Sequence, residues 1–220
     1  MIHFLSRLVL GALLCGSTGW LASAGWAQTP HTHQHSFGGA DQWAQVFDDP
    51  ERDKWQKPHE VIQALALKPD SVVADIGSGT GYFAIRLAHM VPQGVVYGVD
   101  TEPDMVKYLT ERARKLGLTN LIALAGAPDD PRLPANVDVA LFVDVFHHVE
   151  NRAAYLKKLR ASLKPGGRIA VIDFRMDGPV GPPKEGRISA EQVTVELKAA
   201  GFSLVQQHAF LPNQYFLIFQ

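Results

Sequence analysis

The chain has 220 residues, of which 46% are hydrophobic and 20% charged, and its formal net charge at pH 7 is −1. This length and composition predict one well-buried globular domain with a short appendage. The near-neutral charge, together with the lack of a basic stripe interleaved with aromatic residues, argues against a nucleic-acid-binding surface, so we expect no nucleic-acid partner.

Residues 1–27 have the pattern of a secretory signal peptide: a basic residue, an apolar run over residues 8–15, and then small residues. The apolar run is too short to span a bilayer comfortably. We expect export to the periplasm or beyond the cell, with cleavage after Ala24 or Ala27. The alternative is an uncleaved N-terminal anchor, which would be the only membrane contact. Cys15, the single cysteine, lies in this segment, so thiolate chemistry is not expected in the rest of the chain.

Residues 28–57 form a polar extension, or roof segment, ahead of the main domain at residues 58–220. His31, His33 and His35 alternate within this extension. No acid or cysteine completes a ligand set beside them, so we expect a solvated tail and no metal site. Chelation of a borderline metal by the three histidines is the alternative.

Two further features follow in the extension. Residues 40–46 predict a short helix, and the charged run at 51–54, flanked by prolines, predicts turns. Trp43 and Trp55 either cover a ligand pocket or pack on the core, and core packing is the commoner fate of tryptophan.

From residue 60 onward, helical patterns alternate with apolar strands. The expected helices cover residues 60–67, 82–90, 103–116, 152–163 and 190–200, and the expected strands cover residues 72–75, 95–99, 121–125, 137–143, 168–173, 203–210 and 215–219. Strands separated by helices predict a doubly wound α/β fold with a Rossmann-like, seven-stranded and mostly parallel sheet. The last two strands predict an antiparallel C-terminal hairpin.

Three glycines at alternate positions follow the first strand: Gly77, Gly79 and Gly81, with Ser78 between the first two. Glycines let a ligand lie against the main chain, and the following helix directs free N–H groups at it. The spacing differs from the dinucleotide fingerprint, and Asp75 would repel a pyrophosphate. A zwitterion fits better, with its ammonium near Asp75 and its carboxylate at the helix N-terminus. The alternative is a structural tight turn.

The second strand leads into Asp100, nineteen residues after Gly81. In doubly wound folds an acid at about this spacing binds the two hydroxyls of an adenosine ribose. We assign Asp100 and its neighbour Thr101 to the same binding site as the glycine turn. The alternative is that Asp100 caps the helix that begins near residue 103.

Four segments together resemble the class I S-adenosylmethionine-dependent methyltransferases, most closely the type 11 group. They read VADIGSGTG at residues 73–81, VD at 99–100, DVALFVDVFHH at 138–148 and LKPGGR at 163–168, and they occur in family order. The resemblance implies S-adenosyl-L-methionine as the cofactor, bound at the carboxyl ends of the strands. It also implies that Asp75 faces the methionine ammonium and that Asp100 faces the ribose.

The loop after the third strand departs from the family pattern. The family often has Gly-Asp-Ala there, with the acid on the adenine amino group, whereas residues 125–130 read AGAPDD. Asp129, an acid two residues late, takes this role through a different loop path, or it is a solvated turn residue.

The catalytic candidates are Asp144, His147 and His148, which follow the strand at 137–143. Methyl transfer requires alignment and, for many acceptors, removal of a proton. Asp144 is assigned to orienting the substrate or stabilising the sulfonium, and either histidine to general-base catalysis. The alternative is that the histidines only begin the next helix.

The sequence therefore predicts a methyltransferase for a small-molecule acceptor, with a lipid or a quinone-like compound favoured by the expected envelope location. The Gly/Pro-rich loop at residues 177–187 either borders the acceptor pocket or is a stiff crossover. The alternative function is a non-catalytic envelope protein that binds S-adenosylmethionine or a related nucleoside.

Overall fold

The computed structural model describes residues 39–134 and 136–220. The predicted signal segment and the histidines at positions 31, 33 and 35 lie outside the described residues.

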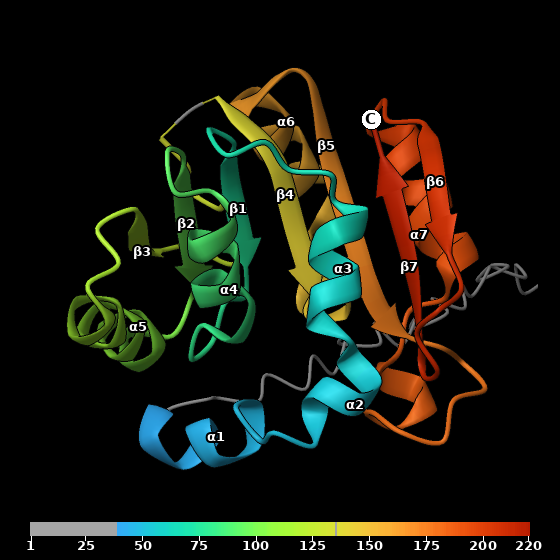
Figure 1. Cartoon of the computed structure of the whole chain (residues 1–220). Helices are drawn as coiled ribbons and strands as arrows, with labels where there is room; N and C mark the ends of the chain where they lie inside the picture. The colour runs from blue at the N-terminus through green and yellow to red at the C-terminus, as the bar shows by residue number, and fades with distance from the viewer. Residues whose placement is uncertain (1–38, 135) are drawn as a thin grey trace, which may run out of the picture. The chain divides into compact units, whose positions relative to one another are not determined.

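Helices and strands alternate along most of the described chain (Figure 1). The helices are α1 (Ala40–Phe47), α2 (Arg52–Gln56), α3 (Pro58–Ala64), α4 (Tyr82–Met90), α5 (Pro103–Leu116), α6 (Arg152–Ser162) and α7 (Ala190–Ala199), with 3₁₀ turns η1 (Phe146–His148) and η2 (Lys184–Gly186). The strands are β1 (Val72–Ile76), β2 (Val95–Asp100), β3 (Leu121–Ala125), β4 (Val137–Val143), β5 (Leu163–Phe174), β6 (Leu204–His208) and β7 (Gln214–Phe219).

The strands form one seven-stranded sheet in the order β3-β2-β1-β4-β5-β7-β6. The first five strands of the chain pair in parallel, and β7 pairs antiparallel with both β5 and β6. The predicted α/β architecture with its antiparallel C-terminal hairpin is therefore confirmed. The chain order reverses between β1 and β4, and the crevice at the carboxyl ends beside such a switch point is where open α/β sheets bind ligands.

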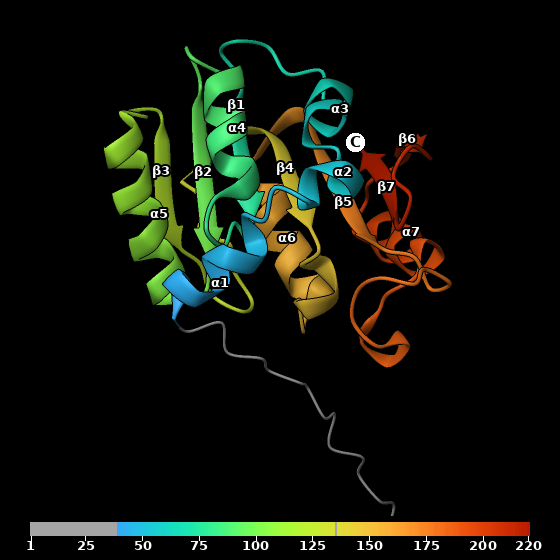
Figure 2. The ribbon, with the colours of Figure 1, turned by 60° about the horizontal axis from the view of Figure 1, so that its bottom comes forward.

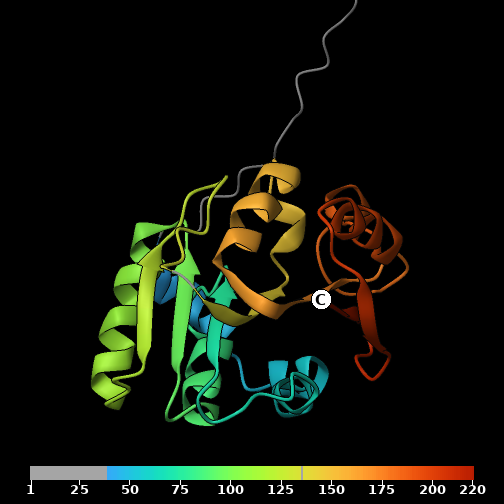
Figure 3. The same cartoon turned by 90° about the horizontal axis from the view of Figure 1, so that it is seen from above.

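Helices cover both faces of this sheet because successive side chains of each strand point to opposite faces. In β4, Leu141 and Val143 pack in the core beneath α3, α4 and α5. Ala140 and Phe142 pack in the second core, beneath α6 and α7. Figure 3 shows the two helical layers from above. Near-continuous burial along the strand, which reads VDVALFV, follows from this double cover.

The helices α1 and α2 lie at the carboxyl ends of the parallel strands, as Figures 1 and 2 show. The backbone N–H of Gly39 donates to Asp104 at 3.0 Å, and Arg112 is ion-paired with Asp48 at 2.6 Å. These contacts attach the two ends of α1 to α5. The expectation of turns alone at residues 51–54 is wrong, because α2 runs through them. Five residues are too few to give a periodic signal, so tertiary contacts decide this helix.

Most other element boundaries agree with the sequence predictions. The helices at 82–90 and 103–116 and the strands at 121–125 and 137–143 have the expected ends. The main difference is β5, which begins at Leu163 and not at residue 168. Leu163 pairs with Val137 across an irregularity in the ladder, so the strand also includes the Pro-Gly-Gly segment at residues 165–167.

No helix among residues 39–134 and 136–220 combines the length and the apolar character needed to cross a membrane.

Candidate functional site

The glycine turn joins β1 to α4 at the switch point of the sheet. Gly77, Gly79 and Gly81 all have left-handed backbone angles, with φ of 69°, 52° and 95°. A Cβ on Gly77 would lie 2.3 Å from Cγ2 of Val145, and one on Gly79 would lie 3.3 Å from Cδ2 of Phe47. The turn therefore requires glycine for both its conformation and its packing. Ser78, between them, is buried beneath the turn.

We expect Gly77→Ala to lower the free energy of unfolding by about 2–5 kcal/mol. A left-handed non-glycine residue costs roughly 1–2 kcal/mol and overpacking roughly 1–3 kcal/mol. Urea unfolding measures this loss, and the double variant Gly77→Ala/Val145→Ala should recover the overpacking part. An unchanged midpoint for Gly77→Ala would show that the turn adapts to a side chain.

Asp75, in β1, is the buried acid of this turn, and only 3% of its surface is exposed. Burial raises the pKa of its carboxyl to about 7, opposed by the backbone N–H of Ala84 and by the charge of Arg52. A carboxylate in this position is stabilised by any cation that a ligand brings.

Asp75→Asn should make the ligand-free protein more stable at about pH 8 but not at about pH 4. The folded-state pKa lies above the ordinary value, so the stability from protonated Asp75 is complete below about pH 4 and is lost as the pH rises through about 7. At about pH 8 the variant should gain roughly 2–4 kcal/mol, at about 1.4 kcal/mol per pKa unit. Urea unfolding of both proteins at both pH values tests this. An equal difference at both would rule out charge burial at Asp75.

Asp100 connects β2 to the glycine turn. Its Oδ2 accepts the backbone N–H of Gly79 at 2.8 Å, and its Oδ1 accepts that of Glu102 at 3.0 Å. Burial raises the pKa of its carboxyl. The N-cap of α5 is Glu102, so Asp100 does not cap that helix. Thr101, which follows Asp100, is exposed. The ribose contact stays a prediction, with this acid held directly beside the turn.

Asp129 has a different environment from Asp75 and Asp100. Its side chain is 61% exposed and is ion-paired with Lys158 of α6 at 2.7 Å, and Lys158 lowers the pKa of the carboxyl. A short bridge between Ala127 and Asp130 closes the turn around it. This environment matches the solvated-turn alternative, and the adenine contact stays a prediction.

Asp144 follows β4 and has a left-handed φ of 58°, which is unusual for a residue with a side chain. The Nε2 of Gln214 donates to its carboxylate, and the Nε2 of Gln56 donates to Oε1 of Gln214 at 2.8 Å. Arg52 completes a ring, donating to Gln56 and approaching Asp144 to 3.9 Å. Burial and the nearby Asp173 raise the pKa of Asp144 to about 7. The ring attaches α2 to the ends of β4 and β7.

His147 and Asp173 form a hydrogen-bonded dyad. The sequence analysis identified His147 as a candidate but not Asp173. Both oxygens of Asp173 lie 2.9 Å from Nδ1 of His147, and Asp173 is fully buried at the end of β5. His148 packs beside His147, with ring centroids 4.1 Å apart. The two histidines form η1 and do not begin α6. An acid at the end of a fifth parallel strand was the available sequence signal for Asp173.

The roof helices bring aromatic rings to the same region. Trp43 stacks on Phe47, with ring centroids 5.3 Å apart. Phe47 in turn lies against the turn at Gly79. Trp55 lies beside Phe174, with centroids 6.3 Å apart. Trp55 thus lies next to the residue that follows Asp173 in the chain.

The loop after β5 is held by Arg187. Its guanidinium donates to the carbonyl oxygens of Pro182, Arg175 and Gly178. Gly181, with φ of 108°, packs on Phe174. These bonds make the loop a defined segment beside Phe174, and its role at an acceptor pocket stays a prediction.

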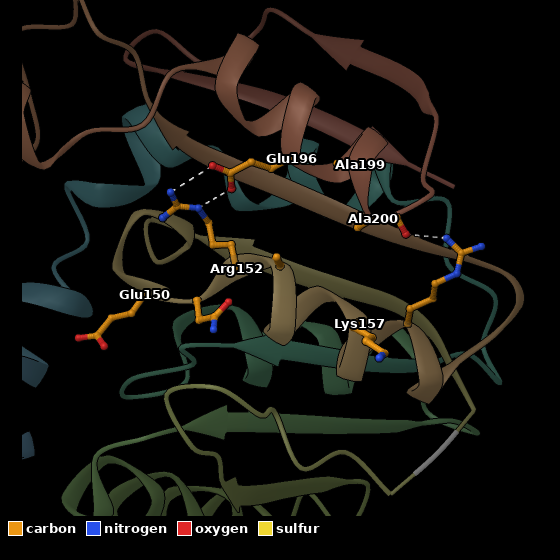
Figure 4. Close-up of a pocket in the computed structure, with 9 residues that line it drawn as sticks. Glu150, Arg152, Lys157, Glu196, Ala199 and Ala200 are labelled. Carbon is orange, nitrogen blue, oxygen red and sulfur yellow. Dashed lines mark hydrogen bonds and ion pairs between the residues drawn. The ribbon is translucent and has the colours of Figure 1, made fainter.

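A surface cavity of about 840 Å³ lies between α6 and α7 (Figure 4) and contains none of the predicted site residues. It is lined by Glu150, Asn151, Arg152, Ala153, Lys157, Arg160, Glu196, Ala199 and Ala200. Figure 4 shows Arg152 paired with Glu196. Arg160 donates a hydrogen bond to the carbonyl of Ala200 at 2.8 Å. The cation-rich wall is thus partly neutralised within the protein. No group of three or more potential metal-ligating side chains occurs among the residues that the structure describes.

Comparisons with known proteins point to one family. Residues 67–209 match the family model described as a methyltransferase domain. The trans-aconitate 2-methyltransferase of Rhodopseudomonas palustris is 32% identical over 134 residues, which are 60% of this chain and 50% of that protein. The ubiquinone/menaquinone biosynthesis C-methyltransferase of Shewanella frigidimarina is 27% identical over 123 residues, 54% of this chain and 48% of that protein. The chain spans about half the length of these curated relatives.

A solved structure is similar over a larger share. The SAM-dependent methyltransferase from Aquifex aeolicus superposes with a TM-score of 0.77 at 29% identity, covering 82% of this chain and 97% of that one.

Proposed function

Because the chain belongs to the class I S-adenosylmethionine-dependent methyltransferases, we propose that it transfers a methyl group from S-adenosylmethionine to a small-molecule acceptor. The observation that carries this proposal is the turn of three left-handed glycines between the buried Asp75 and the partly buried Asp100, at the switch point of the sheet. A turn with little room for a Cβ, beside an acid for which the described residues provide no ion pair, fits an amino-acid nucleoside.

The residues of the turn and its two acids would hold the cofactor. Asp75 would bind the ammonium, Asp100 the ribose hydroxyls, and Gly77, Gly79 and Gly81 would let the main chain approach. When bound, S-adenosylmethionine supplies an electrophilic methyl group on its sulfonium. The protein's own task is then to align an acceptor with that methyl group and exclude water.

His147 is the proposed general base. Asp173 fixes the proton on Nδ1, which leaves Nε2 with a lone pair for the acceptor's proton. Asp144 directly follows β4 and accepts a hydrogen bond from Gln214. We propose that it orients the acceptor. An acceptor with an acidic O–H, N–H or activated C–H group fits this arrangement.

The acceptor is proposed to be a small organic molecule, with lipid and quinone-like compounds included. The net charge of −1 and the absence of a basic aromatic stripe in the sequence support a small molecule over a nucleic acid. Two of the relatives, a trans-aconitate 2-methyltransferase and a ubiquinone/menaquinone biosynthesis C-methyltransferase, are consistent with a small acceptor.

Incubation with methyl-labelled S-adenosylmethionine tests the proposal. Separate reactions should contain a tricarboxylic acid, a hydroxylated quinone or an extracted lipid mixture, and mass spectrometry should follow the label. Labelled product that is lost in the His147→Ala/His148→Ala double variant supports the enzyme. Tight cofactor binding without transfer to any acceptor would support the alternative of a binding protein.

We also propose that the protein is exported, on the charge and hydropathy pattern of residues 1–27. The intact mass of the protein, recovered from each fraction of the cells that make it, tests this. A mass that includes residues 1–27, found in the cytoplasmic fraction alone, would contradict export.

A further inference from the structure

Arg52 of α2 is a buried cation at the centre of the proposed site. Only 15% of its side chain is exposed. Its Cζ lies 4.0 Å from the ring centroid of Tyr82, the residue that follows the glycine turn. Its charge acts on both Asp75 and Asp144. The guanidinium therefore lies where the cofactor side and the acceptor side of the site meet.

The hydrogen bonds of Arg52 go to neutral groups. Nη1 donates to the carbonyl of Phe47 at 3.0 Å, while Nε and Nη2 donate to Oε1 of Gln56 at 3.4 and 3.3 Å. The Asp144 carboxylate, 3.9 Å away, is beyond hydrogen-bond distance. Three of the five N–H groups are thus used within the described part of the chain, and one on each Nη is left.

Such an arrangement is electrostatically costly. Burial lowers the pKa of Arg52, because removal from water disfavours the charged form. Buried charges in proteins are normally paired at contact distance, and here the neighbouring carboxylates act only from further away. The two remaining N–H groups have the fork geometry that binds a carboxylate with two parallel hydrogen bonds.

We propose that Arg52 binds a carboxylate group that enters the site with a ligand. This inference rests on the proposed function and deepens it. The carboxylate has two possible sources: the methionine portion of the cofactor and an acidic acceptor. In an amino acid the carboxylate and the ammonium are attached to the same carbon. Arg52 is close enough to Asp75 for its charge to lower the pKa of that carboxyl, so a ligand whose ammonium binds Asp75 would also bring its carboxylate near Arg52.

Arg86 provides a matched control. Its Cζ lies 4.1 Å from the centroid of the same Tyr82 ring. Unlike Arg52, it is 37% exposed and is ion-paired with Asp53 at 3.1 Å. The two arginines share a stacking partner and differ in exposure and in the length of their ion pairs, 3.9 Å from Arg52 to Asp144 and 3.1 Å from Arg86 to Asp53.

Titration calorimetry with two nucleosides tests the cofactor source. S-adenosylhomocysteine carries the amino-acid portion, and 5′-methylthioadenosine lacks it. Arg52→Gln should weaken S-adenosylhomocysteine binding by about 10- to 100-fold and leave methylthioadenosine binding unchanged. Arg52→Lys should restore part of the loss, and Arg86→Gln should change neither affinity. Unchanged methylthioadenosine binding also shows that the Arg52 variant is folded.

An acceptor carboxylate predicts a different result. Affinity for S-adenosylhomocysteine would then be unchanged, and benzoate would inhibit methyl transfer by the wild type but not by Arg52→Gln. If neither S-adenosylhomocysteine affinity nor benzoate inhibition depends on Arg52, the proposal is overturned. Failure of the wild type to bind either nucleoside would instead refute the proposed function, which separates the two conclusions.

Discussion

Replacement of Asp173 by asparagine is expected to lower the kcat of methyl transfer by about 100- to 10,000-fold, the usual contribution of a general base, while cofactor affinity is retained. Both Asp173 oxygens contact Nδ1 of His147 at 2.9 Å in a fully buried position. An asparagine can donate its NH₂ to Nδ1 and so stabilise the tautomer whose Nε2 carries the proton. That tautomer cannot accept a proton, and the neutral amide no longer stabilises an imidazolium.

The kinetics should be measured with the acceptor found in the labelling assay, over a range of pH. Asp173→Asn should have a lower kcat than the wild type at each pH, because the neutral amide no longer holds the His147 ring as the carboxylate does. His147→Ala should show a similar loss and His148→Ala a smaller one, because Asp173 contacts Nδ1 of the His147 ring at 2.9 Å. Near-normal kcat in Asp173→Asn, with S-adenosylhomocysteine still bound, would exclude His147 as the base.

The three acids at the strand ends make the crevice electrostatically unusual. Asp75, Asp144 and Asp173 end β1, β4 and β5 or directly follow them, and burial raises the pKa of the first two to about 7. Arg52 is the cation whose charge opposes this at both Asp75 and Asp144. A ligand with an ammonium and a sulfonium brings positive charge to such a site, and its carboxylate is the group that Arg52 lacks. The charges of the site and of the proposed cofactor are therefore complementary.

The sequence predicted the sheet and its glycine turn because these depend on local patterns. Apolar runs bounded by glycine, proline or acids gave the strand at 137–143 and the helix at 103–116 with their observed ends. The acids at positions 75 and 100 could be found because each lies at or next to the carboxyl end of a strand. Each of these features is encoded within a few residues.

The parts that sequence reading missed depend on contacts between distant segments. Gln56 and Gln214, which bond each other, are separated by 158 positions in the chain. Asp173 and His147 come from β5 and η1, and the ring orientation that joins them is set by the sheet. Arg52 was interpreted only as part of a charged turn. The helix α2 has only five residues, so no hydrophobic periodicity in the sequence predicts it.

Asp75→Asn should weaken the binding of S-adenosylmethionine and S-adenosylhomocysteine by at least tenfold, since a charge-assisted hydrogen bond contributes about 1.5–3 kcal/mol. The effect is expected because Asp75 is 3% exposed and the ligand ammonium would be its direct cationic partner in a setting that water does not screen. The same variant is expected to stabilise the ligand-free protein above neutral pH. Binding and stability should thus change in opposite directions, which a general folding defect cannot produce.

Titration calorimetry at about pH 8 gives the affinities, and 5′-methylthioadenosine serves as the control ligand. This nucleoside has no ammonium, so its affinity should be the same in wild type and Asp75→Asn. The loss for S-adenosylhomocysteine should also shrink toward about pH 5, because wild-type Asp75 is then largely protonated and resembles the asparagine. Equal affinity of the two proteins for S-adenosylhomocysteine at pH 8 would remove Asp75 from the ammonium site. Equal losses for both nucleosides would instead assign Asp75 to the shape of the glycine turn, because only a distorted turn affects a ligand that carries no charge.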